Sequence, residues 1–253
     1  MTKHFPAAQA VTANNPDIPE YLLLTRIFLL SLVEIMNVII TGGPSSEPID
    51  EVRLITNRST GELGLILAQA FWQSGHQASL FLGRLSQFRH PQATYFDRNE
   101  DLLRMLGEVN ESKSVNVVLH AAALADFQVT AVRAGNLDVG SRKIGSDHQI
   151  LSVELAPKQK VIAGLRDLFP NALIVGWKLE LEGSRSDLIQ EATVQVKKNR
   201  TDACVINGRA FGEGFGFCTM EGLGESFLSK PDLASFLVDW AERCWDGMGG
   251  EER

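Results

Sequence analysis

The strongest constraint on the fold is an alternation that begins at Met36, where short β-branched apolar runs are separated by amphipathic segments. Short apolar runs are typical of buried strands, and amphipathic segments of the helices that cover them. We expect strands at residues 37–41, 78–82, 115–120, 150–155, 173–178 and 203–207, and helices at 61–74, 100–109, 160–169 and 187–198. This alternation predicts α/β architecture with a doubly wound, mostly parallel, Rossmann-like sheet.

The C-terminal part departs from that alternation. Residues 215–228 predict a β-hairpin around Gly222 and Gly224, and Pro231 opens a last amphipathic helix that ends near Gly247. With 44% hydrophobic residues in 253, the chain can bury a full core. We therefore expect one domain at residues 36–247 with a C-terminal hairpin excursion.

The first residues read differently, because a polar stretch leads into an apolar run at 21–33. Arg26 interrupts this run and Glu34 follows it, and it is shorter than the roughly 20 residues of a membrane span. A signal peptide is not indicated either, since Lys3 is the only basic residue ahead of the run and no small-residue cleavage pattern follows. We expect residues 1–35 to be an N-terminal extension, either disordered or produced by an upstream start codon.

Composition excludes several functional classes. The net charge of −7 and the pI near 5.3 disfavour the broad basic surface that nucleic acid or anionic lipid requires. Cys204, Cys218 and Cys244 contain no CxxC pair, and the five histidines lack metal-ligand spacing. We expect a cytoplasmic protein that binds neither nucleic acid nor membrane and has no metal held by protein side chains alone.

Three loops after predicted strands carry the functional signal, because ligands of such sheets bind beyond the carboxyl ends of the strands. Residues 41–61 form an unusually long connection that ends at a helix start, where free N–H groups favour phosphate or carboxylate. Simple helix capping by Ser59 or Thr60 explains this end equally well. Residues 121–127 and 141–145 add a carboxylate beyond small residues and a basic pair among glycines.

Residues 42–64, GGPSSEPIDEVRLITNRSTGELG, resemble the opening motif of phosphopantothenate-cysteine ligases, roughly GGTxEPIDxVRxIxNxSSGxxG. The AAALADF loop at 121–127 is similar to the AAVADY loop of that family, and Lys143-Ile144 resembles its KIK or KISS segment. The segment 174–179, IVGWKL, is similar to VGFKL, and residues 198–207 resemble KNxxDxIVAN. The resemblance covers nearly all of residues 36–246.

This resemblance implies an enzyme of coenzyme A biosynthesis that joins 4'-phosphopantothenate to cysteine. CTP or ATP activates the carboxylate with magnesium, through an acyl-nucleotide for which acyl-cytidylate is the favoured form, and cysteine then displaces the nucleoside monophosphate. A Rossmann-like homodimer is implied as well. Only 35 residues precede the ligase-like part, so the chain resembles the standalone form without the decarboxylase half.

The resemblance also assigns roles to individual residues. Asn57 and Lys143 take the catalytic positions. Nucleotide binding falls to Asp126, Lys143, Pro157, Lys158, Trp177 and Lys198, and substrate binding to Gly43, Arg58, Ser59, Thr60, Gly61 and Ala123. Trp177 is equally well explained as a core aromatic residue, and Lys198 as an exposed helix residue.

Some residues depart from the family pattern, and two other functions stay open. Val194 stands where the family has a lysine one turn before Lys198, and Pro44 where it commonly has threonine. The opening TGG also suits a nicotinamide-dependent reductase of Rossmann type, although it does not extend to GxGxxG and neither Tyr21 nor Tyr95 begins a YxxxK pair. A non-catalytic relative that binds nucleotide is the other alternative.

Overall fold

The computed structural model describes residues 34–248 except 110–113, 136, 141–142, 146–147 and 149. The chain divides at Met36, and residues 36–253 form one compact unit. The expected N-terminal extension lies almost wholly outside the described residues. Within the described part, no helix combines the length and the apolar character that crossing a membrane would require.

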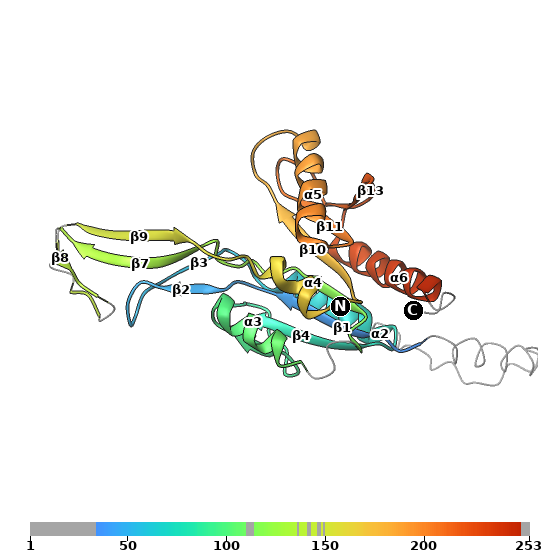
Figure 1. Ribbon diagram of the computed structural model, residues 1–253, viewed down its shortest axis with the longest axis horizontal. Coiled ribbons are helices and arrows are strands. Elements are labelled where there is room, and N and C mark those ends of the chain that lie inside the picture. Colours follow the sequence, from blue (N-terminus) through green and yellow to red (C-terminus); the bar gives the residue numbers. More distant parts are fainter. Residues whose placement is uncertain are drawn as a thin grey trace, which may run out of the picture. The chain divides into compact units, whose positions relative to one another are not determined.

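An eight-stranded sheet in the order β13-β12-β11-β10-β6-β1-β4-β5 forms the centre of this unit (Figure 1). The strands from β5 to β11 are parallel, and β12 and β13 add an antiparallel pair at one edge. The parallel part has the strand order of a Rossmann fold, which confirms the predicted architecture. The bounds are β1 Asn37–Gly42, β4 Gln77–Gly83, β5 Thr94–Phe96, β6 Val117–His120, β10 Leu173–Leu179, β11 Ala203–Asn207, β12 Phe215–Thr219 and β13 Gly222–Phe227.

Helices cover both faces of the sheet, because successive side chains of each strand point to opposite sides. Val38 and Ile40 of β1 pack with Leu67 of α2, in a core that also contains residues of α6. Ile39 packs on the other side, in a cluster with Leu102 of α3. The helices are α2 Glu62–Gln73, α3 Asn99–Gly107, η2 Val161–Gly164, α4 Leu165–Leu168, α5 Arg185–Asn199 and α6 Lys230–Met248.

A separate antiparallel sheet corrects one expectation. The strand expected at residues 150–155 forms as β9 (Leu151–Pro157), but it pairs with β7 (Phe127–Ala134) rather than joining the parallel sheet. β7 also pairs with β8 (Leu137–Asp138), and the hairpin extends away from the central sheet (Figure 1). All residues of β9 are exposed or half-buried, unlike the buried runs of β1 and β6, and the polar Ser152 and Glu154 alternate with its apolar residues.

The long first loop contains a hairpin of its own, and two local predictions need adjustment. β2 (Ser46–Pro48) pairs antiparallel with β3 (Leu54–Thr56) inside residues 41–61. The helix expected at 160–169 is a 3₁₀ turn followed by one short α-helical turn, and the hairpin at 215–228 forms with its turn just before Gly222. Ser184 caps α5, since its hydroxyl oxygen accepts from the N–H of Asp187.

Candidate active site

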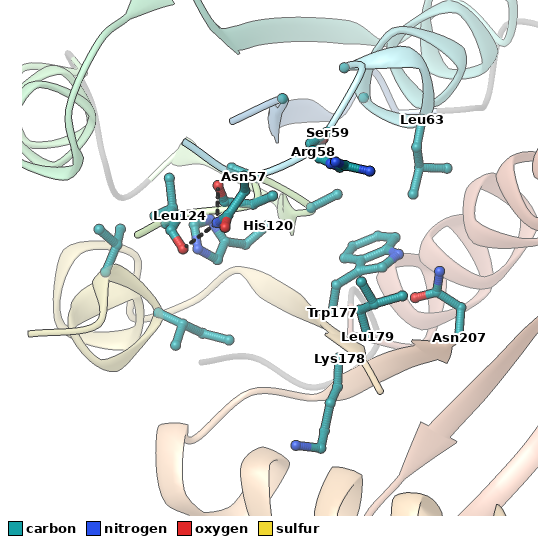
Figure 2. Close-up of a pocket in the computed structure, with 18 of the residues that line it drawn as sticks. Asn57, Arg58, Ser59, Leu63, His120, Leu124, Trp177, Lys178, Leu179 and Asn207 are labelled. Carbon is teal, nitrogen blue, oxygen red and sulfur yellow. Dashed lines mark hydrogen bonds between the residues drawn. The ribbon is translucent and has the colours of Figure 1, made fainter. Parts of the chain in front are cut away.

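A cavity of about 760 Å³ lies beyond the carboxyl ends of β1 and β6, where the strand order reverses. This reversal is where open parallel sheets bind their ligands. The cavity is lined by residues 57–64 at the start of α2, by 120–126 after β6, by 177–180 at the end of β10, and by Asn207 at the end of β11 (Figure 2). Two of the three predicted loops therefore meet at one site.

Glycines bring the N-terminus of α2 against β1. A Cβ on Gly64 would lie 2.9 Å from the Cα of Gly42, so the helix and the strand approach more closely than larger residues allow. Gly43 and Gly61 have φ angles of 74° and 79°, which favour glycine, and both lie against the buried Ser86. The first turn of α2, with its positive dipole end, therefore borders the cavity.

Asn57 joins the two loops that form one wall of the cavity. Its Nδ2 donates to the carbonyl oxygens of Ala123 at 3.0 Å and Leu124 at 2.9 Å (Figure 2). Because carbonyls only accept, the orientation of this amide is fixed, and Oδ1 remains as an acceptor. Ser45 adds a second tie, since its Oγ accepts from the N–H of Ala125 at 2.8 Å. Both amide hydrogens of Asn57 are thus used within the protein.

Most charges of the cavity are paired internally. Arg58 is the exception, since it forms no ion pair or hydrogen bond with any residue in the described part of the chain. An unpaired guanidinium beside a helix N-terminus suits a phosphate or a carboxylate. The paired lysines and carboxylates that line the cavity are Lys230 with Glu62, Lys160 with Asp126 at 3.2 Å, and Lys178 with Glu180 at 3.8 Å. Lys178 also pairs, at 2.8 Å, with Glu191 of α5.

His120 ends β6 and lines the cavity, although the sequence predicted no role for it. The residue is 7% exposed, and its Nδ1 lies 2.9 Å from Oγ1 of Thr41, which is fully buried. Burial lowers the pKa of His120 to about 4, so the imidazole is neutral at physiological pH. Its position as the last strand residue before the AAALADF loop was the sequence signal that could have identified it.

Two buried polar atoms at the cavity have no hydrogen-bond partner among the residues that the structure describes. Trp177 lines the cavity, and its buried Nε1 has no hydrogen-bond acceptor. Asn99 is 3% exposed and donates from Nδ2 to the carbonyl of Ala125 at 2.8 Å, while its buried Oδ1 has no donor. Unpaired buried polar groups are costly, so both atoms are suited to a ligand or to water.

The structure brings together most, but not all, of the predicted site residues. Those that line the cavity are Gly43, Asn57, Arg58, Ser59, Thr60, Gly61, Ala123, Asp126 and Trp177. Pro157 pairs with Phe127 at the end of β9, and Lys158 follows it with a 7% exposed side chain. Lys158 forms ion pairs with Glu47 and, at 2.9 Å, with Glu100, which hold its ammonium behind the site rather than in it.

Lys143 and Lys198 lie elsewhere. The segment of Lys143 is attached to the turn between β2 and β3, where Asp50 accepts from the N–H of Ile144 at 3.2 Å and Arg53 donates to the carbonyl of Ile144 at 2.8 Å. Lys143 is exposed and is not among the residues that line the cavity. Lys198 is exposed in the last turn of α5 and does not line it either.

Several residues of the cavity were not predicted. Lys178 and Asn207 lie at the carboxyl ends of β10 and β11, so the strand-end rule could have indicated them. Lys230 reaches the cavity because α6 packs against α2, a tertiary contact that leaves no local pattern in the sequence. Gln195 and Phe215 join the lining from α5 and β12 for the same reason.

The side chains that line the cavity suit a metal ion that binds together with a phosphate ligand, rather than one that the protein holds alone. In the described part of the chain, no group of three or more histidine, cysteine, aspartate or glutamate side chains is placed to hold a metal ion. The carboxylates of the cavity are each paired with a lysine. Magnesium bound mainly through phosphates and water needs only one or two such carboxylates.

Known proteins resemble the chain over most of its length. It is 32% identical over 213 residues to the coenzyme A biosynthesis bifunctional protein CoaBC of Thermococcus kodakarensis, covering 83% of this chain and 50% of that protein. The chain thus spans about half the length of the curated relatives it matches.

Two solved structures have the same fold. The DNA/pantothenate metabolism flavoprotein of Streptococcus pneumoniae has a TM-score of 0.71 at 22% identity, covering 83% of this chain and 99% of that one. A Cab2 mutant in complex with phosphopantothenate-cysteine has a TM-score of 0.64 at 17% identity, covering 92% and 97%. Residues 33–222 match the DNA/pantothenate metabolism flavoprotein C-terminal domain, and the chain belongs to that family.

Proposed function

We propose that this protein ligates 4'-phosphopantothenate to cysteine at the expense of CTP or ATP. One observation carries the proposal: the segment 57–61 and the loop 121–126 are joined by Asn57 into one cavity, with an unpaired Arg58 at the N-terminus of α2. Such a site attracts anions and holds them in a fixed orientation. The named functions of CoaBC and the ligand of the Cab2 structure support the same reaction.

The reaction has two steps in this proposal. A carboxylate oxygen of phosphopantothenate attacks the α-phosphorus of the nucleotide, and the bond to pyrophosphate breaks. The cysteine amino group then attacks the acyl carbon, the bond to the nucleoside monophosphate breaks, and the amine proton is released to solvent. The free Oδ1 of Asn57 accepts from the amine and orients it, and Arg58 binds one of the anionic groups.

Nucleotide binding is assigned to Trp177 and Asp126. Trp177 lines the cavity and its aromatic face suits a base, and Asp126 lies where the 121–126 loop ends. Magnesium, carried on the phosphates, would neutralise charge there, with Asp126 as the protein carboxylate that would help to hold it. Pro157 and Lys198 remain nucleotide-binding assignments that rest on the resemblance. The resemblance assigns the same role to Lys158, but its ion pairs with Glu47 and Glu100 favour a structural role for it.

In this proposal Lys143 reaches a cavity in one of two ways: it enters the cavity of a second copy of the chain, or its own segment moves towards the cavity of its own chain. The apolar side chains of Val52 (62% exposed), Leu137 (71%) and Ile150 (68%) surround the β2–β3 and β7–β9 hairpins and support a homodimer. Lys143 lies in this region, so a dimer that buries these side chains offers it a route to a partner cavity. Size-exclusion chromatography with light scattering tests the dimer, and a monomer at micromolar concentration would refute it.

The decisive assay combines the purified full chain with phosphopantothenate, cysteine, magnesium and either CTP or ATP, and follows pyrophosphate and the amide product. Absence of product with both nucleotides would refute the proposed function. NADPH oxidation with a carbonyl substrate would establish the reductase alternative, and nucleotide binding without turnover the non-catalytic one.

Two variants connect the assay to the site. Asn57→Ala should lower ligation at least about 100-fold with the fold retained, because it removes the side chain that positions the reacting groups. Lys143→Gln should impair the nucleotide-dependent first step. Lys197→Gln is the matched control, since Lys197 is exposed on α5 and does not line the cavity. Normal rates in Asn57→Ala and Lys143→Gln would remove both assignments.

A further inference from the structure

Asn57 offers a hydrogen-bond acceptor, its Oδ1, to the cavity, but the reaction also requires a neutral hydrogen-bond donor there. Asn57 spends both amide hydrogens on the carbonyls of Ala123 and Leu124, so it cannot donate to a substrate oxygen in this arrangement. Acyl transfer places growing negative charge on the acyl oxygen, which a fixed hydrogen-bond donor stabilises. His120 lines the same cavity and is a candidate for this donor (Figure 2).

The hydrogen-bond pattern around Thr41 fixes the tautomer of this histidine. Oγ1 of Thr41 accepts from the N–H of Ala122 at 3.4 Å and lies 2.9 Å from Nδ1 of His120. Thr41 is fully buried, so its hydroxyl hydrogen needs an acceptor, and Nδ1 is the one available among the hydrogen bonds of the described residues. Nδ1 therefore accepts, and the proton of the neutral ring sits on Nε2.

The Nε2 edge is the part of the ring that remains for a ligand. Nδ1 faces β1, whereas Nε2 has no hydrogen-bond partner in the described part of the chain and is not among its fully buried unpaired atoms. A neutral imidazole N–H can donate to an oxygen that gains charge without adding a cation to a site already supplied with lysines and Arg58.

We propose that His120 is a further catalytic residue, whose Nε2–H donates a hydrogen bond to the acyl oxygen of the phosphopantothenate group. This role rests on the proposed function. When the cysteine nitrogen bonds to the acyl carbon, the electron pair of the C=O bond moves to that oxygen, and the hydrogen bond strengthens. The pair returns as the bond to the nucleoside monophosphate breaks, and His120 keeps its proton throughout. Thr41 is a positioning residue that acts through the ring.

Steady-state kinetics on three variants test this role. His120→Leu should lower kcat about 100-fold, the effect typical of losing one such donor, while KM for each substrate changes less than about threefold. His120→Gln keeps an N–H donor at a similar reach and should recover at least about tenfold of the loss. Thr41→Val removes the hydroxyl that fixes the tautomer and should lower kcat to an intermediate extent.

Imidazole ¹⁵N chemical shifts of the parent protein give a readout that does not depend on activity. The Nε2–H tautomer at pH 7 is expected, and Thr41→Val should change the tautomer ratio. An Nδ1–H tautomer in the parent would overturn the proposal. A folded His120→Leu variant with the kcat of the parent, or a folded His120→Gln variant with a kcat no higher than that of His120→Leu, would overturn it as well. Ligation by the parent and His120→Leu at equal rates refutes only the role of His120, whereas a parent without ligation refutes the proposed function and this role with it.

Discussion

Lys158 offers a sharp test, because the structure gives it a different role from the one that the sequence resemblance assigns. Its ammonium is 7% exposed and pairs with Glu47, whose side chain is 8% exposed, and with Glu100, which is 62% exposed. Burial lowers the pKa of Lys158, but the hydrogen bonds to Glu47 and Glu100 outweigh it and raise the pKa above its ordinary value. The pairing therefore stabilises the folded state.

The expected cost of Lys158→Met follows from which carboxylate is left behind. Glu100 regains water, whereas Glu47 becomes a buried charge without its partner. Removing one member of a buried pair costs about 3–5 kcal/mol, and methionine keeps the apolar stem, so we expect a loss near 3 kcal/mol. For a chain of this size, this corresponds to a fall in Tm of about 6–12 °C.

Urea denaturation followed by far-UV circular dichroism measures the loss, and a double-mutant comparison isolates its cause. Glu47→Gln with Lys158→Met removes the uncompensated charge and should recover about half of the lost free energy. Below the transition, Lys158→Met should change KM for the nucleotide less than about threefold. An unchanged unfolding free energy together with a raised nucleotide KM would refute the structural reasoning and favour the binding role.

Three further outcomes are expected. Trp177→Phe replaces the indole with a smaller phenyl ring and reduces the aromatic area available to a base, so KM for the nucleotide should rise about 2–10-fold, and an unchanged KM would show that no base stacks on Trp177. Gly64→Ala forces a Cβ against Gly42 and should lower the unfolding free energy by about 1–3 kcal/mol in urea titrations, a prediction that a neutral variant would contradict. The hydrogen bond from Arg53 holds the pKa of Asp50 well below its ordinary 3.8. The stability from this pair is therefore fully present above pH 3.8 and is lost as the pH falls towards the pKa of the folded state. Between pH 7 and pH 3, the parent should lose more unfolding free energy than Asp50→Asn.

The sequence predicted the parts of the fold that local patterns encode. The buried run at 37–41 and the helix at 61–74 form as expected, because strand burial and helical periodicity leave local patterns. The antiparallel sheet of β7 and β9 was not predicted. In β9 the polar residues Ser152 and Glu154 alternate with apolar ones, which is typical of a half-exposed strand and could have separated β9 from the parallel sheet. Its partner strand is set by tertiary pairing, which leaves no local pattern.

The candidate site also combines residues that local sequence patterns indicated with residues that only tertiary packing brings to the cavity. Asn57 and Asp126 follow strand ends in a long loop and a small-residue loop, and those signals correctly place them on the cavity. His120 and Lys230 were missed because their exposure to the cavity depends on Thr41 behind one and on the packing of α6 beside the other. Lys158 has the same residue type as a phosphate ligand, and only its buried partners distinguish an internal counterion from a binding group.

The ion pairs inside the cavity imply that ligands enter by exchange. Lys230, Lys160 and Lys178 each pair with a carboxylate, so a phosphate that binds one of these lysines replaces that carboxylate as its partner. Each time a phosphate replaces a carboxylate, one negatively charged side chain is released. A magnesium ion or the ammonium group of an amino acid could then bind to it. Anion and cation binding should therefore be mutually reinforcing, and added salt should weaken both together.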